Sequence, residues 1–325
     1  MTTTAPQRRV LAVASAGGHF KQLVRLVPRI PDVASVTWVT YDSGLAADLL
    51  SSAGREQDRL VYVPYAAPRD VPNLARNAAA IRQLLRGSAH ELAVSTGAGI
   101  AVAALPIARR AGLRSVFIES ATRVGEPSLS GRLLQRTPGV ELYSQAPDGA
   151  RFGRRWGTLG SVFDEFESGQ RRPRREVRRV VVTLGTIRPF GFRRLLDRLV
   201  RLLPPEVDVL WQTGATDTSG LGIDGRAQVP GPELEAAMRA ADVVVAHAGT
   251  GTALSAFEQG RCPVLVPRRE SHGEHVDDHQ VGTAAALASR GIALHAEVDH
   301  LDLDLLREAC ERSVVRRDTV PPLPL

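Results

Sequence analysis

The sequence is poor in lysine, cysteine and aromatic residues, and each shortage excludes a class of function. Lys21 is the only lysine, so the formal charge of +6 is carried almost wholly by arginine. Aromatic residues make up 5% of the chain and do not alternate with arginines, which argues against a base-stacking surface and nucleic acid as a partner. The two cysteines, Cys262 and Cys310, form no Cys-x-x-Cys pair. We therefore expect neither zinc nor thioredoxin-like chemistry, and two unpatterned cysteines suit a reducing cytoplasm.

Long apolar runs are also absent. The most apolar stretch, residues 93–108, contains two glycines and a proline and is shorter than the roughly 18–20 apolar residues that span a bilayer. Residues 1–9 are polar and the apolar run 10–14 is short, so no signal peptide is predicted. We expect a cytoplasmic protein. Its positive charge leaves open a peripheral contact with the inner face of an anionic membrane.

The chain instead contains short apolar runs that alternate with helical patterns, which is typical of parallel sheets. Residues 166–179 are rich in arginine and have little to bury, so we interpret them as a linker between a domain over 1–165 and a domain over 180–325. The predicted strands are Val10–Ser15, Val36–Tyr41, Leu60–Val63, Leu92–Ser95 and Ser115–Ile118, then Val180–Leu184, Val207–Trp211, Val243–Ala246, Val264–Val266 and Ile292–Leu294.

The most informative segment follows the predicted strand Val243–Ala246. It reads His-Ala-Gly-Thr-Gly-Thr over 247–252 and leads into a helical pattern that ends at Gly260. Small residues between a strand and a helix let backbone N–H groups approach an anion, and the helix dipole favours negative charge there. A polar loop with His279 and Gln280 follows the next strand. The pattern favours a diphosphate site over a plain βα turn, because ligands bind at the carboxyl ends of parallel strands.

The first βα turn, Ser15–His19, also indicates chemistry. It lacks the G-x-G-x-x-G pattern, so a nicotinamide site is not favoured. Its paired glycines would let the backbone approach a substrate, and His19 is suited to be a general base near neutral pH; a histidine that caps its helix is the alternative. Glu119, at another strand end, is the competing base, an acceptor ligand or a partner of a helix N-terminus.

These residues carry a resemblance. His247–Thr252 with Asp278-His279-Gln280 resembles the donor-binding half of family 28 glycosyltransferases and of the two-subunit dolichol-diphosphate N-acetylglucosaminyltransferase. The first half is similar to the partner subunit of the latter, through Ser15–His19, Thr96–Gly99 and Phe117–Ser120 with the following Arg123 and Ser128–Gly131. The resemblance implies a GT-B fold, in which two Rossmann-like parallel-sheet domains face a central cleft, here fused in one chain.

The resemblance also implies roles for single residues. It places the acceptor and the catalytic residues His19 and Glu119 in the first domain. One departure is that Ser255 stands where relatives carry a ribose-binding glutamate, and Glu258 follows one turn later. The loops that approach the acceptor or the diphosphate comprise Gly17, Gly18, Gly97, Gly99 and Arg123. The expected donor contacts are Gly185, Thr186, Gln212, Gly214, Val229, His247, Gly249, Thr250, Gly251, Thr252, Glu258, His279 and Gln280.

The function that follows is inverting transfer of a sugar from a nucleoside-diphosphate sugar, with a UDP-sugar favoured, to a hydroxyl of a lipid-linked glycan or a small molecule. Such reactions build cell envelopes, polysaccharides and natural products. We expect no metal or other cofactor, because no Asp-x-Asp motif accompanies the diphosphate loop. A nucleotide-sugar 2-epimerase on the same fold and an inactive nucleotide-sugar-binding partner remain as alternatives.

Overall fold

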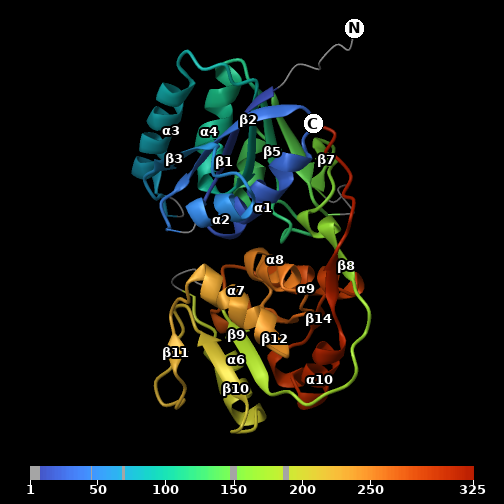
Figure 1. Cartoon of the computed structure of the whole chain (residues 1–325). Helices are drawn as coiled ribbons and strands as arrows, with labels where there is room; N and C mark the ends of the chain where they lie inside the picture. Colours follow the sequence, from blue (N-terminus) through green and yellow to red (C-terminus); the bar gives the residue numbers. More distant parts are fainter. Residues whose placement is uncertain (1–7, 45, 68–69, 147–151, 186–189) are drawn as a thin grey trace. The chain divides into compact units, whose positions relative to one another are not determined.

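The computed structural model describes residues 8–44, 46–67, 70–146, 152–185 and 190–325. The chain divides into two compact units (Figure 1). The first contains Met1–Val162 together with Val320–Leu325, and the second contains Phe163–Thr319. The carboxyl-terminal residues are tied to the first unit by hydrogen bonds, including one from the Leu323 N–H to the Arg29 carbonyl at 2.7 Å.

The first unit is built on a sheet of seven parallel strands in the order β3-β2-β1-β4-β5-β6-β7. The order reverses between β1 and β4, and parallel sheets bind ligands beside such a reversal. The strands are β1 (Arg8–Ala14), β2 (Val33–Tyr41), β3 (Arg59–Val63), β4 (Leu92–Gly97), β5 (Arg114–Ile118), β6 (Val140–Ser144) and β7 (Trp156–Thr158).

Helices cover both faces of this sheet, since alternate residues of each buried strand point to opposite faces. One core contains Leu11 and Val13 of β1 and Ile100 of α4. On the other face Phe20 of α1 meets Trp38 of β2 edge to face at 5.8 Å. The helices are α1 (Gly18–Leu26), η1 (Val27–Arg29), α2 (Ala46–Ser52), α3 (Val71–Leu85), α4 (Gly99–Arg110) and α5 (Leu129–Leu134).

The second unit contains a parallel sheet in the order β11-β10-β9-β12-β13-β14, and this order reverses between β9 and β12. A separate antiparallel pair joins β8 (Phe166–Ser168) to β15 (Val314–Arg316). The sheet strands are β9 (Arg179–Thr183), β10 (Asp208–Gln212), β11 (Gly225–Arg226), β12 (Val243–His247), β13 (Val264–Val266) and β14 (Leu294–His295).

The helices of the second unit follow its strands in alternation. Near the start of this unit, η3 (Val162–Glu165) and β8 precede β9, so the segment interpreted as a linker begins with a strand. Phe166 of that strand is buried and its ring lies 5.4 Å from the ring of Phe257. The remaining helices are α6 (Arg193–Leu202), α7 (Gly231–Ala240), α8 (Thr250–Glu258), η4 (Glu270–His272), α9 (His279–Ser289), η5 (Val298–His300) and α10 (Leu303–Glu311).

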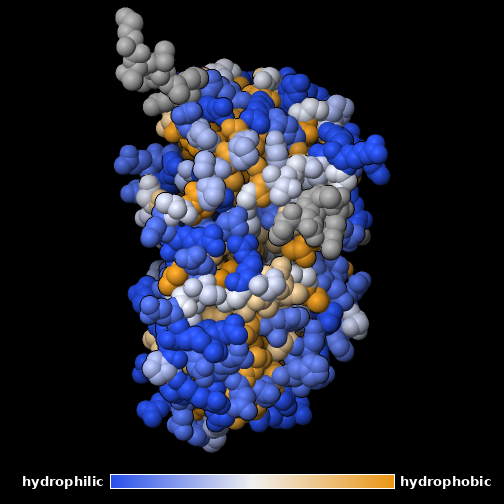
Figure 2. Space-filling model, turned by 90° about the vertical axis from the view of Figure 1, so that its right-hand side faces the viewer, coloured by the Kyte–Doolittle hydropathy of each residue, from blue (hydrophilic) through white to orange (hydrophobic). Residues whose placement is uncertain are grey.

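The predicted two-domain parallel α/β architecture is confirmed, and each predicted strand overlaps an observed one. Five strands were not predicted from the sequence: β7, β8, β11 and β15 have three residues or fewer, and β6 alternates buried with partly exposed residues. Hydrophilic side chains cover most of the face shown in Figure 2, between smaller apolar patches. Across the described residues we find no helix whose length and apolarity would carry it through a bilayer.

Candidate functional site

In the first unit, the predicted loops after β1 and β4 meet where the strand order reverses. The Nδ1 atom of His19 lies 2.6 Å from the Thr96 carbonyl oxygen, and the Thr96 hydroxyl donates to the His19 carbonyl at 2.7 Å. A carbonyl can only accept, so Nδ1 carries a proton, and in the neutral ring Nε2 then carries the lone pair. His19 does not cap α1, which begins without a side-chain cap.

Glycine is required beside this histidine. A Cβ added at Gly97 would lie 3.1 Å from the His19 ring, and Gly97 has a φ of +107°, which disfavours other residues. Gly17 also has a positive φ, of +83°, with open space around it. Gly99 begins α4 beside the side chain of Leu74. The structure thus places His19 against Gly97, and a hydrogen bond of 2.9 Å from the Ser15 N–H to the Gly97 carbonyl joins the two loops that carry Gly17, Gly18 and Gly99.

Glu119 lies inside the first unit, 1% exposed, and its carboxylate accepts three hydrogen bonds. One comes from the Ser120 N–H at 3.0 Å, and two come from the N–H and hydroxyl of Ser128 at 2.8 and 2.9 Å. Ser128 in turn caps α5 by accepting from the Gly131 N–H. Burial raises the pKa of Glu119, although these hydrogen bonds oppose the shift. A carboxylate held in this way orders the loop 119–131, which includes Arg123.

Gln22 and Gln145 join Glu119 in a buried polar network that the sequence analysis did not identify. The Gln22 amide oxygen accepts from the Ala121 N–H and from the Gln145 side chain, each at 2.9 Å. Gln145 also donates to the Glu119 carbonyl. These partners are about a hundred residues apart in sequence, so no local pattern could have revealed them.

In the second unit, the ends of β9 and β12 meet around His247. This buried ring has its Nδ1 atom 3.4 Å from the Thr183 carbonyl. An added Cβ at Gly185, whose φ is +72°, would lie 2.7 Å from the ring, and one at Gly249 would also collide with it. Burial, and then the charge of Arg268, lower the pKa of His247 to about 3. His247 is therefore neutral near pH 7.

The start of α8 presents the donor groups expected of a diphosphate site. Thr250 is its first residue, only 3% exposed, and its hydroxyl oxygen has no hydrogen-bond partner among the described residues. The helix has no side-chain cap, and the first N–H groups of a helix lack acceptors within it. Gly251 and Thr252 follow in the first turn, half-buried. An anion would satisfy these groups together.

Other predicted donor contacts are held by a chain of hydrogen bonds. Gln212 donates to the Thr183 hydroxyl at 2.7 Å and accepts from the Val229 N–H at 3.0 Å. Gly214 follows with a φ of +62°. Glu258 is the exposed last residue of α8, about 12 Å from Thr250 at 1.5 Å per residue, so the structure does not bring it to the end that carries Thr250. Thr186 lies outside the described residues.

The loop before α9 holds the remaining predicted contacts. The Gln280 amide oxygen accepts from the Arg268 N–H at 3.1 Å. His279 bonds through Nδ1 to the carboxylate of Asp277, and its ring meets that of His275 edge to face at 4.7 Å. Ligand atoms of His275, Asp277 and His279 lie within 4.8 Å of one another, close enough to share a metal ion. The sequence predicted only a donor contact for His279 and gave no metal-binding role to His275 or Asp277.

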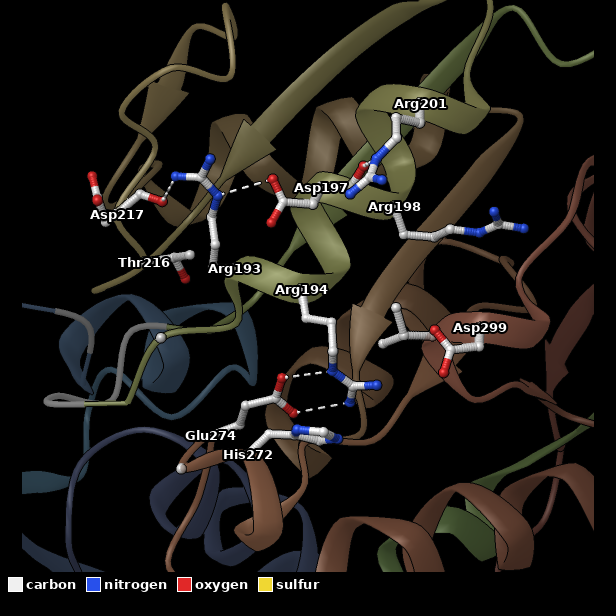
Figure 3. Close-up of a pocket in the computed structure, with 13 residues that line it drawn as sticks. Arg193, Arg194, Asp197, Arg198, Arg201, Thr216, Asp217, His272, Glu274 and Asp299 are labelled. Atoms are coloured by element: carbon white, nitrogen blue, oxygen red, sulfur yellow. Dashed lines mark hydrogen bonds and ion pairs between the residues drawn. The ribbon is translucent and has the colours of Figure 1, made fainter.

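An open pocket of about 740 Å³ lies beside α6 (Figure 3). Its arginines are engaged: Arg194 donates to Glu274 at 3.1 and 3.3 Å, and Arg193 donates to Asp197 at 3.1 Å. None of the predicted donor contacts lines it. Arg194 and Glu274 line this pocket, and their ion pair holds the polar loop before α9 from outside the candidate site.

Comparison with known proteins finds a likeness in the second unit. Residues 200–313 match the model of the glycosyltransferase family 28 C-terminal domain. A curated relative from Chlorobium phaeobacteroides, UDP-N-acetylglucosamine--N-acetylmuramyl-(pentapeptide) pyrophosphoryl-undecaprenol N-acetylglucosamine transferase, is 32% identical over 124 residues. That match covers 34% of this chain and spans about a third of the relative, 33% of its length.

Solved structures extend the likeness to nearly the whole chain and show the predicted GT-B fold. MurG of Acinetobacter baumannii has a TM-score of 0.57 at 16% identity, over 93% of this chain and 89% of its own. A UDP-N-acetylglucosamine 2-epimerase has a TM-score of 0.58 at 12% identity, over 93% of this chain and 86% of its own. Because a transferase and an epimerase fit about equally well, the fold does not decide between the two activities.

The buried His247 should make stability depend on pH. Its pKa falls from about 6.5 in an unfolded chain to about 3 in the fold, so between these values the unfolded state binds a proton that the folded state does not. Stability is then fully present above pH 6.5 and is lost as the pH falls. We expect His247→Gln to flatten the decline between pH 6.5 and 5, measured by hydrogen exchange of β9 and β12 peptides. His272→Gln, at an exposed position, should keep the wild-type slope; equal slopes in all three proteins would contradict the assignment.

Proposed function

We propose that this protein is an inverting glycosyltransferase that uses a nucleoside-diphosphate sugar, with a UDP-sugar favoured. The observation that carries the proposal is the buried Thr250 hydroxyl without a partner among the described residues, at the uncapped start of α8. An unsatisfied buried hydroxyl costs about 1–3 kcal/mol, and a diphosphate would relieve that cost. The match of residues 200–313 to the family 28 C-terminal domain supports the same ligand class.

The first unit supplies the acceptor side of the reaction in this proposal. His19 Nε2 takes the proton of the acceptor hydroxyl while that oxygen attacks the anomeric carbon. The bond from this carbon to the diphosphate breaks, and the nucleoside diphosphate leaves with the electron pair. Groups at the start of α8, including Thr250 and Thr252, stabilise the charge that develops on the leaving group. Glu119 acts as a positioning residue, because its carboxylate is occupied by Ser120 and Ser128.

A lipid-linked acceptor at the cytoplasmic membrane surface is the finer proposal, and a small-molecule acceptor is its alternative. The Chlorobium relative is named for a pyrophosphoryl-undecaprenol acceptor. In this chain, Leu129 and Leu133 of α5 are 63% and 42% exposed and lie one helical turn apart, beside the exposed Arg132 and Arg136. Apolar side chains among arginines suit a peripheral contact with anionic lipid.

The first test is incubation with radiolabelled nucleotide sugars. A transferase should release nucleoside diphosphate slowly without acceptor, an epimerase should return an isomerised sugar, and an inactive partner should bind without turnover.

Thr250→Val should weaken nucleoside-diphosphate binding by about tenfold to a hundredfold, the range for a hydrogen bond to a charged group. Affinity for the free nucleoside, measured by calorimetry, should not change. Equal losses for both ligands would argue against a diphosphate at Thr250.

The second prediction separates His19 from Glu119. Loss of a general base typically costs about 10²–10⁴ in rate, so His19→Ala should lower kcat by that factor while donor KM stays nearly constant. Glu119→Gln keeps the shape of the side chain, and we expect a smaller loss of kcat together with a lower Tm. If Glu119→Gln abolishes kcat while His19→Ala weakens only acceptor binding, the two assignments are reversed.

The third prediction is that turnover needs no metal ion. The Asp302-Leu303-Asp304 pattern is engaged elsewhere, because Asp302 caps α10 and Asp304 accepts from Arg174 and Arg307. Only His275, Asp277 and His279, among the described residues, could gather an ion. A chelator should therefore leave kcat/KM unchanged in the wild type. Activity lost to the chelator and restored by Mg²⁺ or Mn²⁺ would refute metal independence, and Asp277→Asn would show whether this cluster holds the ion.

A further inference from the structure

Arg268 is a buried cation to which the proposed reaction assigns no role. It follows β13 and Pro267, and its residue surface is 1% exposed. Arginine stays protonated in proteins, and although burial lowers the pKa of Arg268 to about 10, it remains charged at neutral pH. A buried charge is costly unless an opposite charge or several hydrogen bonds compensate it.

The contacts of Arg268 compensate that charge only in part. One terminal nitrogen donates to the Leu184 carbonyl at 2.6 Å, and the guanidinium carbon lies 6.0 Å from the centre of the Phe192 ring. Its Nε atom is buried and has no hydrogen-bond partner among the described residues. Neither a carbonyl nor an aromatic ring carries a formal negative charge, so both leave the net positive charge in place.

The acid that acts on Arg268, Glu274, is already committed to other groups. Its charge raises the pKa of Arg268, but its two oxygens accept from Arg194, and one also accepts from the Arg269 N–H at 3.0 Å. Within the part of the chain that the structure describes, no ion pair joins Arg268 to a carboxylate. The positive charge of Arg268 is therefore not neutralised within the described protein.

This charge lies beside the candidate diphosphate site. Leu184, which Arg268 contacts, directly precedes Gly185, and Gly185 lies against the ring of His247. Arg268 also helps to keep His247 neutral. The strand order places β12 between β9 and β13, so Arg268, His247 and the start of α8 occupy neighbouring strand ends. The charge of Arg268 and the start of α8 both favour an anion over a cation.

We propose that Arg268 is the buried counter-charge of the donor diphosphate, and of the nucleoside diphosphate that leaves. This inference rests on the proposed function, because it takes the α8 site to bind a diphosphate. The competing explanation is that Arg268 merely ties β13 to the end of β9 through Leu184. The two explanations differ in one measurable respect, since a counter-charge discriminates between ligands by their charge and a structural tie does not.

The test measures binding of uridine, UMP, UDP and inorganic pyrophosphate to the whole chain by calorimetry. Arg268→Met removes both the charge and the bond to Leu184, whereas Arg268→Gln removes the charge but keeps an amide that can donate. We expect both variants to bind UDP about tenfold to a hundredfold more weakly, the range for a hydrogen bond to a charged group. The loss for UMP should be smaller, and uridine affinity should be unchanged.

Arg198→Met is the matched control. Arg198 also donates to a backbone carbonyl, that of Leu301, from α6 of the same unit, and its loss should leave all four affinities at wild-type values. Thermal unfolding without ligand reports any structural damage, and if Arg268→Met does not fold, Arg268→Gln alone decides the question.

Three outcomes would overturn the inference. One is an equal loss for uridine and UDP, which indicates a structural tie, and another is no loss for any ligand. The third is a wild-type protein that binds neither UDP nor pyrophosphate, which overturns the proposed diphosphate site as well. If the wild type binds pyrophosphate but not UDP, and the Arg268 variants lose it, the anion site stands and only the choice of nucleotide fails.

Discussion

The candidate site in each unit depends on the same local arrangement. A histidine ring lies against the backbone at the carboxyl end of the neighbouring parallel strand. His19 bonds to the carbonyl of Thr96, and His247 lies against the carbonyl of Thr183. In both cases the ring occupies the space that a Cβ of a nearby glycine would fill, at Gly97 and at Gly185. In both units the two strands concerned, β1 with β4 and β9 with β12, are the neighbours between which the strand order reverses.

The two histidines differ in burial. His19 is half-buried and its Nδ1 atom lies at the Thr96 carbonyl. His247 is buried near Arg268, and its pKa of about 3 keeps it neutral. A neutral ring in that place leaves the start of α8 and Arg268 as the sources of positive potential. Similar backbone geometry thus surrounds a half-buried histidine in one unit and a buried, uncharged histidine in the other.

Short-range patterns in the sequence were sufficient to predict ten of the described strands and the loops that follow β1 and β12, but not β6, β7, β8, β11 and β15. Val243–His247 is continuously apolar until the histidine, and glycines follow it. The partners of Glu119 and the network of Gln22 and Gln145 were not predictable, since they join residues far apart in the chain. Arg268 was also overlooked, because one arginine among many shows its burial only once the fold is known.

The position of a charge therefore matters more here than the number of charges. Most arginines of the second unit that form ion pairs do so at or near the surface, as Arg193 does with Asp197 and Arg226 with Glu233. Such pairs are screened by solvent and salt and contribute little to recognition. Arg268 is shielded from solvent and has no carboxylate bonded to it in the described structure, so its field is weakened far less. A net charge of +6 spread over the surface would attract many anions weakly, whereas the proposed counter-charge of Arg268 would act on an anion with little screening.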